Sequence, residues 1–294
     1  MALVERSERG GALSLPRPSR SDIPMIAKAP VLERAMRRDH IIVIIGLVSV
    51  CGASWLYILA GAGIDMEARS SGAAMISMAL DRTPAYFALM FAMWWVMMVA
   101  MMLPSAAPMV LFFATINRKS HDRGQDYVPT AIFAAGYLVA WGGFSLLAVI
   151  LQWGLDRWVL LSPMMATSSA DLGGALLIGA GIYQLTPLKH ACLRHCRSPF
   201  ELIAHRWRTG AGGAFRMGIE YGLFCLGCCW VLMALLFYGG VMNLWWIAGL
   251  ALYVLIEKLT PAGHRLGRFT GALLIIWGGL VLAGALAGNL SGSG

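Results

Sequence analysis

Five of the six cysteines gather in two short runs, KHACLRHC and FCLGCCW, which flank one basic segment. They are Cys192, Cys196, Cys225, Cys228 and Cys229. In a helix, positions i, i+3 and i+4 share one face, so the three thiols of the second run can point to one side together. Clustered thiolates are soft ligands that suit Cu(I), Zn(II) or an iron–sulfur centre, whereas carboxylates suit hard cations. The pattern therefore favours a soft-metal site.

Two histidines of the first run, His190 and His195, add imidazole nitrogens to the candidate metal ligands. Nearby Lys and Arg side chains are expected to lower the thiol pKa values, which helps both metal binding and redox chemistry. The spacing C-x3-C…C-x2-C-C is not a standard zinc-finger pattern, which argues against a purely structural zinc knuckle. The alternative is packing, because Cys is also a small apolar residue common in buried helices, and Cys51 fits that role.

A second candidate ligand set is the methionine-rich segment LMFAMWWVMMVAMMLPSAAPM, which falls within residues 85–117. Its members are Met90, Met93, Met97, Met98, Met101, Met102 and Met109. At helical spacing they form two neighbouring stripes, and thioethers bind Cu(I) well. Met97 and Met101 are the candidate ligands here, although such a stripe also serves as adaptable core packing. Pro104 and Pro108 should kink or break this helix and free backbone carbonyls.

The elements that must position these side chains are apolar helices. Apolar residues make up 59% of the chain and charged residues 13%, against about a quarter charged in a soluble domain. The apolar residues fall into blocks of about twenty, the length of a membrane-spanning helix, and a helix satisfies its own backbone in hydrocarbon. We expect an all-α, polytopic transmembrane bundle of about seven spans. The spans are predicted at residues 39–60, 85–117, 130–153, 172–188, 218–239, 243–259 and 269–290.

The basic residues predict how the bundle is oriented. All but three of the 23 Lys and Arg residues lie in the first 38 residues or in connections on the same side of the membrane. Since basic residues mark the cytoplasmic side, the N-terminus is expected in the cytoplasm and the C-terminus outside. Residues 1–38 are rich in Ser, Pro, Gly and charge and are expected to be a disordered cytoplasmic tail. The net charge of +8 then reflects topology and gives no argument for nucleic-acid binding.

Two nine-residue segments resemble each other at an offset of 74 positions, IYQLTPLKH at residues 182–190 and IEKLTPAGH at residues 256–264. Thr-Pro ends a helix, so the simple interpretation is two similar helix stops. The alternative is a parallel repeat of helical hairpins, as in transporter folds. Glu220, Glu257 and Lys258 are near the ends of predicted spans, where charged groups can extend to the interface; the alternative for Glu220 and Glu257 is a functional role, because a buried ionisable group is costly.

Three motifs carry a resemblance to a known family. They are A-M-M-x-P-x3-P-M ending at Met109, Y-Q-x-T-P-x-K-x2-C-L-x2-C-R-S-P from Tyr183, and C-x-G-C-C-W from Cys225. Together they resemble a bacterial family of predicted metal-binding integral membrane proteins of unknown function, sometimes labelled copper chaperones. The resemblance covers residues 85–288. It implies that the five clustered cysteines are the metal-site candidates and that the Met-rich helix is a family trait.

The sequence thus favours a multi-pass protein of the bacterial inner membrane that binds a soft metal, copper first and zinc second, in metal handling or delivery. Its expected partners are membrane lipid, the metal ion and another membrane or metal-delivery protein, with no nucleic acid. No P-loop, Rossmann glycine motif or hydrolase triad is present, which argues against nucleotide hydrolysis. A membrane thiol or metal redox enzyme and a structural subunit of a membrane complex remain the alternatives.

Overall fold

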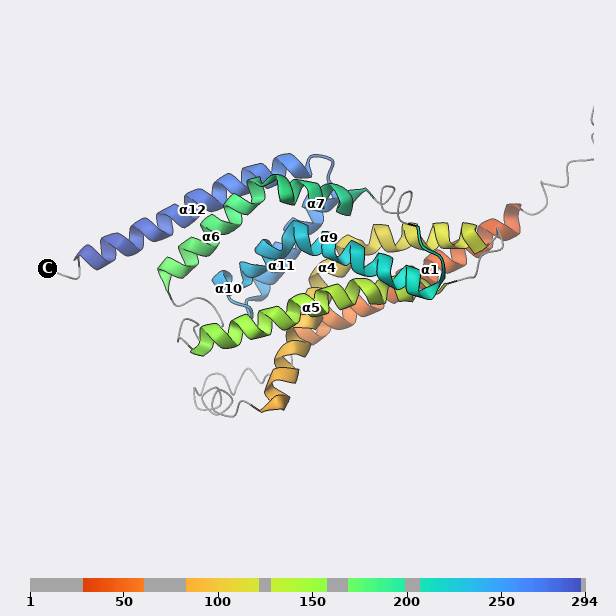
Figure 1. Cartoon of the computed structure of the whole chain (residues 1–294), viewed down its shortest axis with the longest axis horizontal. Helices are drawn as coiled ribbons and strands as arrows, with labels where there is room; N and C mark the ends of the chain where they lie inside the picture. The colour runs from red at the N-terminus through yellow and green to blue at the C-terminus, as the bar shows by residue number, and fades with distance from the viewer. Residues whose placement is uncertain (1–28, 61–82, 122–127, 158–168, 199–206, 292–294) are drawn as a thin grey trace, which may run out of the picture. The chain divides into compact units, whose positions relative to one another are not determined.

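The computed structural model describes residues 29–60, 83–121, 128–157, 169–198 and 207–291, and this part of the chain is α-helical with no strand (Figure 1). The helices are α1 (Ala29–Leu59), α4 (Pro84–His121), α5 (Thr130–Arg157), α6 (Ala170–Leu185), α7 (Pro187–Arg197), α9 (Gly210–Ala234), α10 (Leu236–Gly239), α11 (Leu244–Leu259) and α12 (Gly263–Ser291). The chain divides into two compact units, Met1–Asp39 and His40–Gly294, and the second holds every contact discussed below. The all-α prediction is confirmed.

Five helical segments are long and apolar enough to cross a membrane. They are Ile41–Leu59, Pro84–His121, Thr130–Leu155, Gly210–Gly239 and Gly263–Ala287. The segments expected at 172–188 and 243–259 correspond to α6 and α11, which are 16 residues long each. A count of seven spans and the orientation of the termini stay predictions. Of the expected tail, residues 1–28 lie outside the described residues, and residues 29–38 are the start of α1.

Two helix pairs pack backbone against backbone through glycine. In the α5–α9 pair, a Cβ added at Gly136 would overlap the carbonyl oxygen of Phe215, and one at Gly218 would overlap that of Phe133. In the α6–α12 pair, a Cβ added at Gly181 would lie 2.6 Å from the carbonyl oxygen of Gly271. Small residues allow this close approach between helices. The Gly-rich α12 therefore uses its small face within the chain, against α6.

Helix α4 supplies much of the core, and all seven of its methionines are buried. It continues through Pro104 and Pro108 without a break, although Figure 1 shows that its two halves run in different directions. A proline at position i cannot donate to the carbonyl at i−4, so Pro104 frees the carbonyl of Ala100. The thiol of Cys51 donates to that carbonyl at 3.8 Å. Cys51 thus satisfies a backbone group that the proline leaves open.

Both Thr-Pro motifs end a helix, as predicted. Thr186 is the C-cap of α6, and its side chain also caps the start of α7, where Pro187 is the first residue. Thr260 is the C-cap of α11, shortly before α12 begins. The first motif therefore starts a second helix, which carries Cys192 and Cys196, as well as ending one.

The backbone contact between α5 and α9 can be tested with two alanine substitutions in the same helix. Gly136→Ala forces a methyl group into the Phe215 carbonyl, whereas Gly143→Ala meets no atom within 4 Å. Both gain helix propensity of about 1 kcal/mol, but overpacking at Gly136 costs about 1–3 kcal/mol. We expect thermal unfolding in detergent to shift to lower temperature for Gly136→Ala only. Equal melting curves for the two variants would contradict the packing.

Candidate metal-handling site

The three cysteines of α9 lie on one buried face of the helix, as their spacing predicts. Cys225, Cys228 and Cys229 are each 1% exposed or less. The thiols of Cys228 and Cys229 donate to the carbonyl oxygen of Cys225, at 3.0 and 2.9 Å. A thiol donor that bonds back to the preceding turn keeps its sulfur close to the helix axis. The three sulfur atoms therefore share a small volume inside the bundle.

Helix α7 adds two more thiols to this volume. Cys196 is buried, and its thiol interacts with those of Cys225 and Cys228. Cys192, one turn earlier, is half-buried, with its Sγ 2.8 Å from the position that a Cβ would take at Gly227. Because Gly227 has no side chain, α7 can bring its thiols directly onto α9. The structure thus brings all five sequence-predicted cysteines to the α7–α9 contact, four buried and Cys192 at the edge.

Lys258 lies beside these thiols, and the sequence did not reveal this. Its Nζ is 2.9 Å from Cys225 Sγ and 3.1 Å from Ser105 Oγ, and the residue is only 7% exposed. The hydroxyl of Tyr137 lies 3.2 Å from the same sulfur. The expectation that Lys258 extends to the interface was therefore wrong. A buried ammonium is costly unless it has polar or negative partners, and here the sulfur of Cys225 is one of them.

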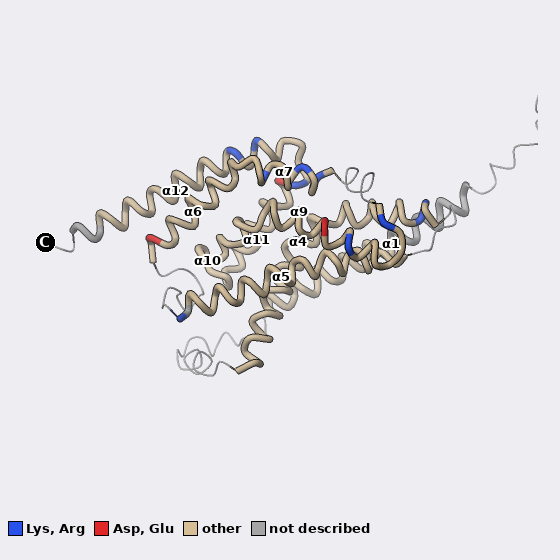
Figure 2. The backbone as a smooth tube through the Cα atoms, in the orientation of Figure 1, with Lys and Arg blue, Asp and Glu red and all other residues tan. Residues whose placement is uncertain are grey.

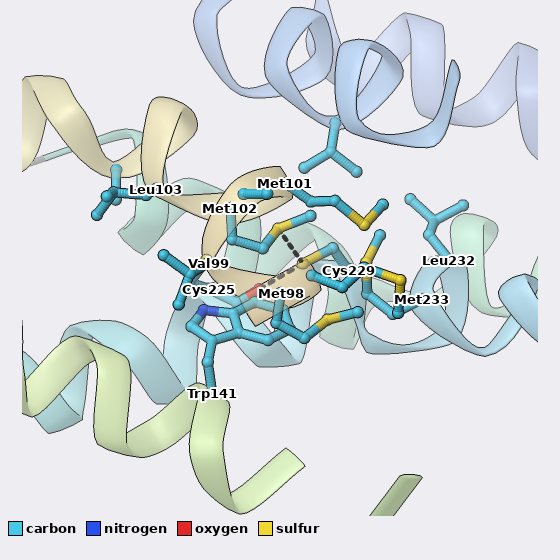
Figure 3. Packing of buried hydrophobic residues seen from close by; sticks show 14 of the residues in the cluster. Met98, Val99, Met101, Met102, Leu103, Trp141, Cys225, Cys229, Leu232 and Met233 are labelled. Carbon is cyan, nitrogen blue, oxygen red and sulfur yellow. Dashed lines mark hydrogen bonds between the residues drawn. The ribbon is translucent and has the colours of Figure 1, made fainter. Parts of the chain in front are cut away.

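The methionine stripe meets the cysteines at Met102. The thiol of Cys229 lies 3.8 Å from Met102 Sδ, and Figure 3 shows Met98, Met101 and Met233 around the same contact. The predicted ligands Met97 and Met101 are both buried in α4, in the same core as Met102. Met102 was not among the ligands predicted from the sequence, which were Met97 and Met101. Its distance from the cysteines along the chain hid a contact that only the fold of α4 against α9 creates.

The two predicted histidine ligands lie in α7 but in different surroundings. The ring of His190 faces that of His264, with 4.6 Å between centroids, and neither nitrogen of His190 has a hydrogen-bond partner among the described residues. His195 stacks on Phe224 at 4.7 Å, and its Nδ1 lies 2.9 Å from the Ala191 carbonyl oxygen. His190 and His264 occupy equivalent positions of the two nine-residue segments, so these segments meet in space.

The α7 thiols do not behave as their basic sequence neighbours suggested. Burial raises the pKa of the Cys192 thiol, and hydrogen bonds with the Cys225 and Cys228 thiols, followed by burial, raise the pKa of Cys196. The expected lowering of the pKa was wrong for these two thiols, and two basic residues close to them in sequence, Lys189 and Arg197, are engaged elsewhere. Lys189 Nζ pairs with Glu257 Oε1 at 2.5 Å, both side chains being 1% exposed, and the Arg197 guanidinium donates to the Thr260 carbonyl.

The side chains of the site suit a soft monovalent ion such as Cu(I) better than Zn(II). Among the described residues, no group of three or more His, Cys, Asp or Glu side chains is arranged to hold an ion. A tetrahedral zinc site, which takes four such ligands, therefore finds no support. The Cys229 and Met102 sulfur atoms, 3.8 Å apart, can both reach one ion at a metal–sulfur distance of about 2.3 Å. Thiolate with thioether is a soft pair that suits Cu(I).

The exposure of the thiols predicts the order in which they react. In a Cys51→Ser background, iodoacetamide should modify Cys192 first and leave the three α9 thiols unmodified while the protein stays folded. The raised pKa of Cys192 leaves less thiolate at neutral pH, so its rate should keep rising at alkaline pH where an exposed cysteine has levelled off. Peptide mass spectrometry measures both effects. Modification of all five thiols at one rate would contradict the burial.

The comparisons with known proteins agree with this chemistry. A family model described as "PpoB2: Copper chaperone" matches residues 91–281, a range that contains α9, α7, most of α4 and every cysteine of the two runs. Neither the curated proteins nor the solved structures give a match. Because the family model covers well over half of the chain, the family assignment made from the motifs is confirmed, and the chain belongs to the PpoB2 copper chaperone family.

Proposed function

We propose that this protein is a multi-pass protein of the bacterial inner membrane that takes up Cu(I) at cytoplasmic-side cysteines and passes it to buried methionines. The observation that carries the proposal is the 3.8 Å contact between Cys229 Sγ and Met102 Sδ. It joins the five-thiol cluster to the methionine stripe of α4 without an intervening side chain. The family description supports a role in copper handling.

The placement of charge supports the membrane orientation. Figure 2 shows the described Lys and Arg residues near helix ends, at α7 and the turn into α12 among others, with uncharged lengths of helix between them. On the proposed topology the ends of α4, α6 and α11 and the starts of α9 and α12 face the cytoplasm. The thiols of α7 then lie at the cytoplasmic edge of the bundle, where reducing conditions keep them as thiols.

The exposure of the sulfur atoms gives the order of transfer. Cys192 is the half-exposed thiol, Cys196 is next on the same face of α7, and the buried thiols of α9 follow. At each step one copper–sulfur bond forms before another breaks, and copper stays in the +1 state. The thiol protons leave when thiolates bind the metal. The transfer is therefore ligand exchange and needs no electron donor.

Beyond Met102 the buried methionines continue toward the N-terminal end of α4. Met101, Met98, Met97, Met93 and Met90 are all in the core. Met102 and Met90 are twelve positions apart, which corresponds to about 18 Å of helix at 1.5 Å per residue. On the proposed topology this end of α4 faces the outside. The stripe would thus lead a soft ion away from the cytoplasmic thiols and across much of the bilayer.

The positive charge of Lys258 favours binding of a monovalent ion over a divalent ion at the thiols. With two thiolates of the cluster and the neutral Met102 thioether as ligands, the Cu(I) site carries a net charge of −1, which the ammonium of Lys258 balances inside the bundle. Two thiolates and Zn(II) are already neutral, so Lys258 would leave an uncompensated positive charge in a low-dielectric site, which is unfavourable. The contact of Lys258 Nζ with Cys225 Sγ, at 2.9 Å, places this charge directly beside the thiols.

A second candidate function is thiol redox catalysis at Cys225. This sulfur has both the ammonium of Lys258 and the hydroxyl of Tyr137 within 3.2 Å, and such neighbours can activate a nucleophilic thiol. The burial of Cys225 argues against it, because a substrate disulfide could not reach the sulfur without a large opening of α7. The metal experiment below separates the two functions.

Metal content measured by elemental mass spectrometry tests the proposal. The full chain, purified in detergent and reconstituted with Cu(I) under reducing conditions, should hold about one equivalent of copper. A Cys225→Ser, Cys228→Ser, Cys229→Ser variant should lose it, whereas Cys51→Ser, which removes a thiol outside the cluster, should keep it. Absence of bound copper in the parent protein would contradict the proposal. Redox-dependent modification of Cys225 would then favour the function as a thiol redox enzyme.

A pair of methionine variants tests the step into the membrane. Met102→Leu removes the thioether next to Cys229 and should weaken Cu(I) retention against a chelator, while Met109→Leu, an equally buried change, should not. X-ray absorption should show a sulfur ligand lost from the copper in the first variant alone. If the two variants behave alike, the methionines of α4 are packing residues.

The charge of Lys258 gives a prediction about metal selectivity. Lys258→Met removes the balancing ammonium, and loss of one partner of a buried charged pair costs about 3–5 kcal/mol. We expect Cu(I) affinity to fall by at least about tenfold, which corresponds to 1.4 kcal/mol, and the preference for Cu(I) over Zn(II) to fall with it. Lys258→Arg should keep most of the preference for Cu(I) over Zn(II). Lys119→Met, a control at an exposed position, should keep all of that preference. Unchanged selectivity in Lys258→Met would contradict the charge balance.

A further inference from the structure

The face of α7 that points away from the thiols lines a separate cavity. Its volume is about 360 Å³. The lining residues are His190, Leu193, Arg194, Arg197, Ser198 and His264. On a helix of 3.6 residues per turn, positions 190, 194 and 197 fall on one side and positions 192 and 196 on the other. Helix α7 therefore presents sulfur to α9 and a basic surface to this cavity.

The lining of the cavity has the chemistry of an anion site. It offers two guanidinium groups, two imidazoles and a hydroxyl, and no carboxylate is among its lining residues. Arg268 and Lys189 add positive charge around His190. The nearby carboxylate of Glu257 is already paired with Lys189. Both nitrogens of His190 are buried without a hydrogen-bond partner among the described residues, so the site has unused hydrogen-bonding capacity.

These groups match phosphate better than a metal ion. Guanidinium groups bind phosphate oxygens through paired, charge-assisted hydrogen bonds. The imidazoles of His190 and His264, 4.6 Å apart, could in isolation hold a cation. The adjacent Arg194 and Arg197 make this unfavourable, because they would repel it at close range. The volume of the cavity also exceeds what a bare ion requires and fits a small organic phosphate.

The neighbouring surface indicates where the phosphate comes from. Leu188, two residues before His190, is 61% exposed, and Phe269, five residues after His264, is 65% exposed. Large apolar side chains with this exposure suit the acyl chains of a bilayer, and basic pockets between helices on the cytoplasmic side bind anionic headgroups. We propose that the cavity between α7 and the start of α12 binds a phosphate group, supplied by the headgroup of an anionic phospholipid.

Native mass spectrometry and thermal stability of the full-length, detergent-purified protein test this site. Phosphatidylglycerol should bind at least about tenfold more tightly than phosphatidylcholine and should raise the melting temperature more. Arg194→Gln and His264→Gln, alone and together, should reduce this preference. Arg265→Gln removes the same charge from an exposed position of α12 outside the cavity and should leave the preference intact. Circular dichroism and gel filtration check that each variant is folded.

A separate arm with inorganic phosphate distinguishes the two sources of the ligand. Stabilisation by inorganic phosphate that equals the effect of phosphatidylglycerol, and that is lost in Arg194→Gln, would keep the phosphate site but assign it to a soluble ligand. No response to either probe overturns the proposal, and so does an equal loss in Arg265→Gln, which would indicate surface charge alone. Stabilisation by Cu(I) that is lost in His264→Gln would make the cavity a metal site and also overturn it.

Discussion

The contact between the ammonium of Lys258 and the sulfur of Cys225 is the interaction on which the arrangement of the core depends. A buried positive charge at the end of α11 needs partners, and they come from different helices: Cys225 of α9 and Ser105 of α4. Tyr137 of α5 reaches the same sulfur. One polar cluster thus connects four helices, and it is separate from the other buried ion pair, Lys189–Glu257. Slipping α11 by a turn would take the ammonium away from both Cys225 and Ser105, a cost of several kcal/mol that apolar packing alone would not impose.

Helix α7 contacts the rest of the bundle through a helix cap, an ion pair and a hydrogen bond to a carbonyl group. Thr186 caps its first turn, the buried Lys189–Glu257 pair joins it to α11, and Arg197 reaches the carbonyl that ends α11. Between these contacts, Cys192 lies against Gly227 of α9 and Cys196 interacts with the thiols of Cys225 and Cys228. The sequence CLRHC thus carries sulfur on one face and positive charge on the other, so one short helix serves two kinds of ligand chemistry.

Local patterns in the sequence were enough to predict the helices, because long apolar runs favour helices. They also predicted the face shared by Cys225, Cys228 and Cys229, because the spacing of residues around a helix fixes which side chains share a face. The Thr-Pro motifs also predicted where α6 and α11 end, since proline chemistry is local. The partners of those thiols depend on long-range packing, and there the pattern failed. Lys258 follows Glu257 near a helix end, where charged groups commonly reach water, and nothing local shows that it turns inward. The contacts of Met102 with Cys229 and of His190 with His264 were not foreseen for the same reason, because these neighbours are distant in the chain.

Thr186 joins two helices with different partners, which has a mechanical consequence. Helix α6 lies against α12, whereas α7 lies against α9, and a single residue ends the first and begins the second. Because only Thr186 separates the two helices, a movement of α6 is passed directly to α7. A rotation of the α6–α12 pair relative to the α5–α9 pair would move Cys192 and Cys196 either away from the sulfur atoms of α9 or closer to them. Access to the thiols would then depend on the position of the α6–α12 pair, to which α7 is joined through Thr186.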